Sequence, residues 1–106
     1  MRKANVMVLK EKFDRVQLRH IRPDNKTGAT VAILVSGEKA FVGYSLCHDN
    51  DQFDRKKGRN IAIGRAQHLF NNQTIEKFGM FEINAAGIEP AALMEIAVEQ
   101  VLAPLY

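Results

Sequence analysis

The chain has 106 residues, of which 46% are hydrophobic and 25% are charged, a composition typical of a single soluble globular domain covering residues 1–106. No apolar run approaches the about 20 residues of a transmembrane helix, and the apolar stretch near the N-terminus is too short for a signal-peptide core. The single cysteine, Cys47, excludes an internal disulfide and favours a reducing compartment. We therefore expect a cytoplasmic protein without a membrane segment.

The net charge of +3 conceals an uneven distribution. Residues 1–26 contain eight Lys/Arg and three acidic residues, and residues 54–65 contain five and one. Residues 66–106 contain one Lys and five Glu. A basic front and an acidic tail favour a polyanionic ligand at one face, and they are also compatible with head-to-tail self-association.

Hydrophobic alternation and turn residues predict four strands in the first half, over residues 4–9, 13–22, 29–35 and 39–46. In the second of these, Val16 and Leu18 alternate with Arg15 and Arg19, which places the arginines on the outer face. The third and fourth strands form a hairpin around Gly37.

A helix should follow, with Asn50 or Asp51 as its cap and an end near Phe70. A strand over residues 77–84 then precedes a second helix that starts at Pro90 and ends before Pro104. The resulting order is ββββαβα. It predicts an α+β fold, an antiparallel sheet with two helices packed on one face.

The start of the first predicted helix carries a dense group of cations. On a helix, Lys56, Lys57 and Asn60 fall outside the apolar arc, whereas Arg59 and Arg65 fall within it. A guanidinium there can lie over the sheet, pair with a buried acid or reach a ligand. The first turn also offers free N–H groups and the positive end of the helix dipole. We therefore predict phosphate-type anion binding by Arg55, Lys56, Lys57, Arg59, Asn60 and Arg65.

Two glycines inside this helix, Gly58 and Gly64, each cost about 1 kcal/mol relative to alanine. Such a cost indicates that another body approaches the helix backbone closely. For Gly58, inside the apolar arc, we expect tight packing on the sheet. For Gly64, on the polar side, a ligand or a partner chain is as plausible as internal packing.

Residues 47–65 follow the pattern Cys-x-x-x-Asp-Gln-Phe-x-Arg-Lys-x-Gly-Arg-x-Ile-Ala-x-Gly-Arg. This pattern resembles small proteins of bacteriophages and prophages, in which a hairpin leads into a basic helix. It is also similar to phage anti-Thoeris and anti-CBASS sponge proteins, which sequester signalling nucleotides of bacterial immunity as oligomers. The resemblance implies an anti-defence homo-oligomer in the host cytoplasm that binds a cyclic nucleotide or ADP-ribose derivative. Its phosphate contacts would be Arg55, Lys56, Arg59 and Arg65.

A second resemblance is to double-stranded RNA-binding domains, in which a hairpin also precedes a helix that starts with lysines. Here Lys56 and Lys57 are followed by the small residues Ala62 and Ala66 on the predicted core face. Such helices place their first lysines on phosphates with little sequence readout. This chain opens with predicted strands instead of that family's first helix, so the minor-groove contact is missing.

Catalysis and metal binding have little support in the sequence. Cys47 and His48 are adjacent on a predicted strand, where neighbouring side chains point to opposite faces, and no Cys/His pair has zinc-type spacing. No phosphate-loop or dinucleotide-binding motif is present. We expect no enzyme activity, no metal and no cofactor.

The leading hypothesis is non-catalytic binding of a phosphorylated small molecule, with no membrane partner. Two alternatives stay open. A duplex-binding domain would add Arg15, Arg19 and Arg22 to the basic helix. A phage inhibitor would dock on a host protein through its acidic helix, which carries Glu89, Glu95 and Glu99.

Overall fold

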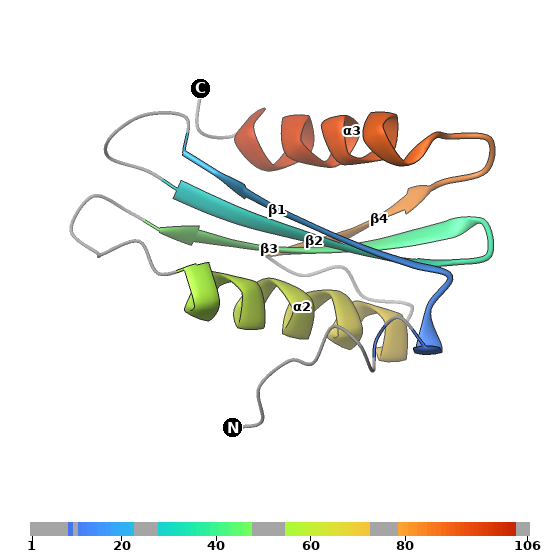
Figure 1. Cartoon of the computed structure of the whole chain (residues 1–106), viewed down its shortest axis with the longest axis horizontal. Coiled ribbons are helices and arrows are strands. Elements are labelled where there is room, and N and C mark those ends of the chain that lie inside the picture. Colours follow the sequence, from blue (N-terminus) through green and yellow to red (C-terminus); the bar gives the residue numbers. More distant parts are fainter. Residues whose placement is uncertain (1–8, 10, 23–27, 48–54, 73–78, 104–106) are drawn as a thin grey trace.

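The structure is a computed structural model that describes residues 9, 11–22, 28–47, 55–72 and 79–103. Three strands are followed by a helix, a fourth strand and a second helix (Figure 1). These elements are β1 (Arg15–Ile21), β2 (Gly28–Ser36), β3 (Lys39–Cys47), α2 (Arg55–Asn72), β4 (Met80–Asn84) and α3 (Pro90–Leu102). The expected α+β fold with an antiparallel sheet is confirmed.

The four strands form one sheet in the order β1-β2-β3-β4, and every neighbouring pair is antiparallel. β2 and β3 form the expected hairpin, closed by the pair Ser36↔Lys39. Gly37 has φ of 63°, the left-handed conformation that two-residue hairpin turns require at their first position. The Gly37 amide donates to Oδ2 of Asp14 at 2.7 Å, which ties the turn to the start of β1.

The expectation that both helices pack on one face is wrong, because α2 covers one face of the sheet and α3 covers the other (Figure 1). The reason lies in β2. Its residues Ala32 and Leu34 belong to the core under α2, whereas Val31 and Ile33 belong to the core under α3. A strand that is apolar on both faces has to be covered on both.

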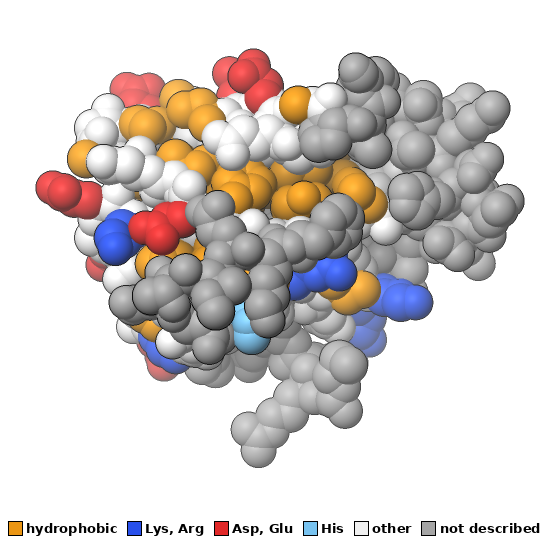
Figure 2. Space-filling view, turned by 180° about the vertical axis from the view of Figure 1, so that it is seen from behind, with side chains coloured by type: hydrophobic (Ala, Val, Ile, Leu, Met, Phe, Trp, Pro, Cys, Tyr) orange, Lys and Arg blue, Asp and Glu red, His pale blue; other side chains and the backbone are white. Residues whose placement is uncertain are grey.

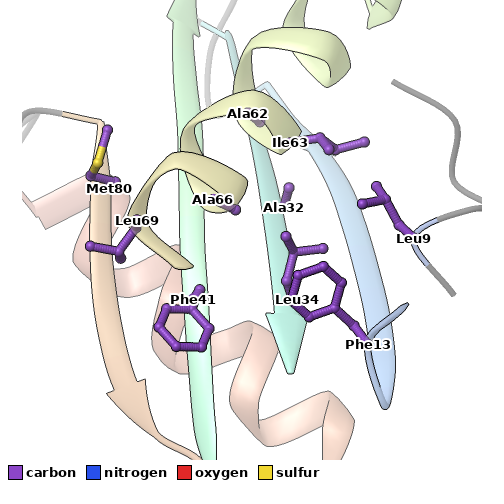
Figure 3. Close-up of a cluster of buried hydrophobic side chains, with 10 residues drawn as sticks. All are labelled: Leu9, Phe13, Ala32, Leu34, Phe41, Ala62, Ile63, Ala66, Leu69 and Met80. Carbon is purple, nitrogen blue, oxygen red and sulfur yellow. The ribbon is translucent and has the colours of Figure 1, made fainter. Parts of the chain in front are cut away.

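On the α2 side, four small or branched residues of the helix lie against three strands and the segment before β1 (Figure 3). This core consists of Leu9, Phe13, Ala32, Leu34, Phe41, Ala62, Ile63, Ala66, Leu69 and Met80. On the α3 side, Leu93, Met94, Ala97 and Val101 are the buried helix residues.

The strands and helices from β1 onward lie close to their predicted bounds. Residues 4–8 of the first predicted strand lie outside the described residues, and Leu9 belongs to a helical turn rather than a strand. Asn50, Asp51 and residues 77–78 also lie outside them. Among the helices of the described segments, none is both long and apolar enough to cross a membrane.

Candidate functional site: the first turns of helix α2

Two glycines allow α2 to lie very close to the sheet. A Cβ on Gly43 of β3 would overlap the backbone oxygen of Ala62 and the backbone nitrogen of Ala66. A Cβ on Gly58 would lie 2.5 Å from Oγ1 of Thr30. Tight helix-on-sheet packing at Gly58 is therefore confirmed.

Beneath Gly58 the interface between α2 and the sheet becomes polar. Oγ of Ser45 donates to the Gly58 carbonyl oxygen at 3.2 Å, and Oγ1 of the fully buried Thr30 shares a 2.9 Å hydrogen bond with Nδ1 of His20. Sequence reasoning missed this cluster. The available signal was period-2 spacing, because His20 continues the series of Val16 and Leu18 on the α2 side of β1.

Helical spacing groups Lys56, Arg59 and Asn60 on one face of α2, because residues three and four apart are neighbours on a helix. Lys56 is exposed, and Arg59 and Asn60 are half-buried. Nε of Arg59 and Oδ1 of Asn60 are buried and have no hydrogen-bond partner in the part of the chain that the structure describes. An unmatched buried polar atom costs about 1–3 kcal/mol, and more when the group is charged. This face therefore holds one unmatched donor and one unmatched acceptor.

Arg59 lies on the flank of α2 that faces β1. Ile63, one turn further along α2, shares this flank and points toward Leu9 beside β1 (Figure 3). Gly58 lies over Thr30, whose cross-strand partner on β1 is His20. Arg59 therefore stands at the His20 end of β1, next to the polar cluster.

Arg65, which was also predicted to contact the ligand, lies apart from this group. It is half-buried on the opposite flank of α2, where Nη1 donates to the Tyr44 carbonyl oxygen at 2.7 Å. Its side chain also packs over Gly79, where a Cβ would lie 2.7 Å from Nη1. From its position in the apolar arc, Arg65 was expected to lie over the sheet, pair with a buried acid or reach a ligand. In the structure its guanidinium lies over the sheet and bonds a main-chain carbonyl there.

The remaining predicted positions on α2 are exposed or have undescribed side chains. Lys57 is exposed on the next face around the helix, and Gly64 is exposed with nothing in the described chain within 4 Å of an added Cβ. Packing against the described residues therefore does not explain Gly64. Arg55 is the first residue of α2, and its side chain lies outside the described part, as does His48. The described segments contain no group of three or more His, Cys, Asp or Glu side chains able to hold a metal ion.

The arginines of β1 do not extend this surface. Val16 and Leu18 pack into the core under α2, so Arg15 and Arg19, which alternate with them, point to the side of α3. The duplex-binding hypothesis combines these arginines with the basic helix in one surface. In the structure Arg15 and Arg19 lie on the α3 side of the sheet, and the basic helix lies on the other side.

The chain matches no protein-family model, no curated protein and no solved structure.

Proposed function

We propose that this protein binds a phosphorylated small molecule on the face of α2 formed by Lys56, Arg59 and Asn60. The proposal depends chiefly on the two unmatched buried atoms, Nε of Arg59 and Oδ1 of Asn60, beside an exposed lysine. A phosphate oxygen supplies the acceptor that Arg59 lacks, and charge-assisted bonds of this kind are about twice as strong as neutral ones.

The unmatched acceptor narrows the class of ligand. Inorganic phosphate can offer Oδ1 of Asn60 only the single hydroxyl of the same small anion that Arg59 would bind, whereas a nucleotide also carries ribose hydroxyls and base amino groups away from its phosphate. Phosphate and donor on one molecule fit a nucleotide better than a bare anion. Together with the resemblance to sponge proteins, this favours a cyclic nucleotide or an ADP-ribose derivative that is held without chemical change.

Sequestration of an immune-signalling nucleotide, as a phage anti-defence function, is the biological role we propose on this basis. Lys57 and Arg55 lie in the same first turns of the helix and add long-range attraction for an anion. Arg65 is left out of the proposed site because its guanidinium already bonds the sheet.

The test is a thermal-shift panel followed by calorimetric titration. The panel contains cyclic dinucleotides and trinucleotides, ADP-ribose derivatives, inorganic phosphate, and short RNA and DNA duplexes. A ligand at about 100 times its dissociation constant adds roughly 2.7 kcal/mol of stability, a shift of about 10 °C or more in a domain of this size. We expect one nucleotide to produce such a shift and inorganic phosphate to produce little.

Variants then locate the site. Arg59→Ala and Asn60→Ala should each weaken the nucleotide complex, the former by about tenfold to a hundredfold, because a hydrogen bond to a charged group contributes about 1.5–3 kcal/mol. Arg19→Ala removes the same charge on the other side of the sheet and should leave binding unchanged. Equal losses in Arg59→Ala and Arg19→Ala, or a shift with duplexes alone, would count against a small-molecule site and favour nucleic acid. No shift with any compound would overturn the proposal.

A further inference from the structure

The outer face of α3 carries negative charge that no basic residue of the described segments pairs with. Glu95 and Glu99 are exposed and lie one helical turn apart, where like charges destabilise a helix by about 0.2–0.5 kcal/mol. Glu99 also lies in the last turn, next to the negative end of the helix dipole. α3 contains no Lys or Arg, and neither glutamate forms an ion pair within the described segments. Figure 2 shows acidic side chains along the upper margin, on the side of α3, and basic ones lower on the molecule.

Strand β1 carries the opposite charge on the same side of the sheet. Arg15 and Arg19 are exposed, point to the α3 side, and make no ion pair with any residue that the structure describes. β1 is an edge strand of the sheet, so its outer border faces away from the other strands. Two cations and two anions, none of them paired with a described residue, thus share one side of one domain.

These two surfaces are held in a fixed relation. Gln17, between the two arginines, donates from Nε2 to the carbonyl oxygen of Pro90 at 2.8 Å, which joins β1 to the first residue of α3. Surfaces that are already positioned lose less freedom when a partner binds.

We propose that a second copy of this chain covers this side of the domain, with Arg15 and Arg19 of one copy facing Glu95 and Glu99 of the other. The two arginines and the two glutamates are equal in number and opposite in charge, and every copy of the chain carries both pairs. Under two-fold symmetry each set of contacts forms twice, so one interface balances all eight charges, four from each chain. A basic host protein would balance only the glutamates, and a polyanion only the arginines.

The test is sedimentation velocity on the full chain at low and high salt. Raising the salt from about 0.1 M to about 1 M shortens the screening length from about 10 Å to about 3 Å, so the dimer expected at low salt should dissociate. The double variants Arg15→Glu/Arg19→Glu and Glu95→Lys/Glu99→Lys should each raise the dissociation constant of the dimer by at least about tenfold. A matched control, Glu11→Lys/Glu38→Lys, changes the charge at two exposed sites elsewhere and should dimerise like the parent.

An equimolar mixture of the two reversal variants gives the sharpest result. Each variant carries only one sign on this side, so neither should associate alone, whereas the mixture should recover dimers. Circular dichroism establishes that both variants are folded before mixing. A parent that is monomeric at low salt, reversal variants that dimerise unchanged, or a mixture that stays monomeric would each overturn the proposal. All three outcomes are independent of nucleotide binding at α2.

Discussion

The guanidinium of Arg65 donates a 2.7 Å hydrogen bond to the carbonyl oxygen of Tyr44, one residue beyond the last register pair of β3 with β4, Gly43↔Met80. The Tyr44 amide donates at 2.8 Å to the carbonyl oxygen of Gly79, at the point where the chain enters β4. An arginine from the helix therefore continues the hydrogen bonding of the strand edge beyond the end of the β4 ladder.

Replacing Arg65 should consequently affect stability. Arg65→Ala should lower the free energy of unfolding by about 1–3 kcal/mol, because it removes a charged donor from a part-buried carbonyl. Arg65→Lys should recover only part of the loss, since an ammonium lacks the planar fork of the guanidinium. Urea denaturation measures both. An unchanged midpoint for Arg65→Ala, with loss of nucleotide binding instead, would return Arg65 to the ligand site.

The contact between Arg65 and Gly79 predicts a coupling that a double-mutant cycle can measure. Gly79→Ala alone should be destabilising for two reasons. Its φ of 89° disfavours a side chain, and the new Cβ would crowd the guanidinium at 2.7 Å. In an Arg65→Ala background the crowding is gone, so the second substitution should cost at least about 0.5 kcal/mol less. Strict additivity would show that the two residues do not touch in solution.

Gly43 should tolerate no side chain. In Gly43→Ala the methyl group would overlap backbone atoms of Ala62 and Ala66, which can move only if the whole helix moves. We expect a loss of about 3 kcal/mol or more, at the upper end of overpacking effects. Thermal unfolding measures it, and a melting temperature close to that of the parent would show that α2 does not lie this near to β3.

Gly64 provides the matched control in the same region. Gly64→Ala places a methyl group in open space in the middle of α2, so it should stabilise the isolated protein by about 0.5–1 kcal/mol. If a ligand or a partner chain contacts this position, the same substitution should weaken that complex while it stabilises the free domain. A destabilised free domain would contradict the open surroundings of Gly64.

Much of the fold follows from local patterns, and the errors have identifiable causes. The hairpin of β2 and β3 was predictable because two apolar runs lie on either side of the turn residues Ser36, Gly37 and Glu38. The expectation that both helices lie on one face is wrong because it overlooks the unbroken apolar run from Val31 to Val35. Its lack of alternation also signals a strand buried on both faces.

The candidate site was predictable in part. The cationic helix and the packing role of Gly58 follow from helical spacing. The bond from Arg65 to Tyr44 and the pairing of His20 with Thr30 depend on how α2 and β1 align with the sheet, and that alignment is set by contacts between distant segments. Helical angle alone could not distinguish Arg59 from Arg65.

The buried hydroxyl of Thr30 makes the two faces of β2 chemically different. Neighbouring residues of this strand serve different cores, so a shift of one position would exchange every side chain between the two faces. The hydroxyl of Thr30 would then enter the hydrophobic core beneath α3 and lose the imidazole of His20. Because burying an unpaired hydroxyl is unfavourable, Thr30 disfavours the shifted register. It thereby helps to fix which face of β2 packs against α2 and which packs against α3.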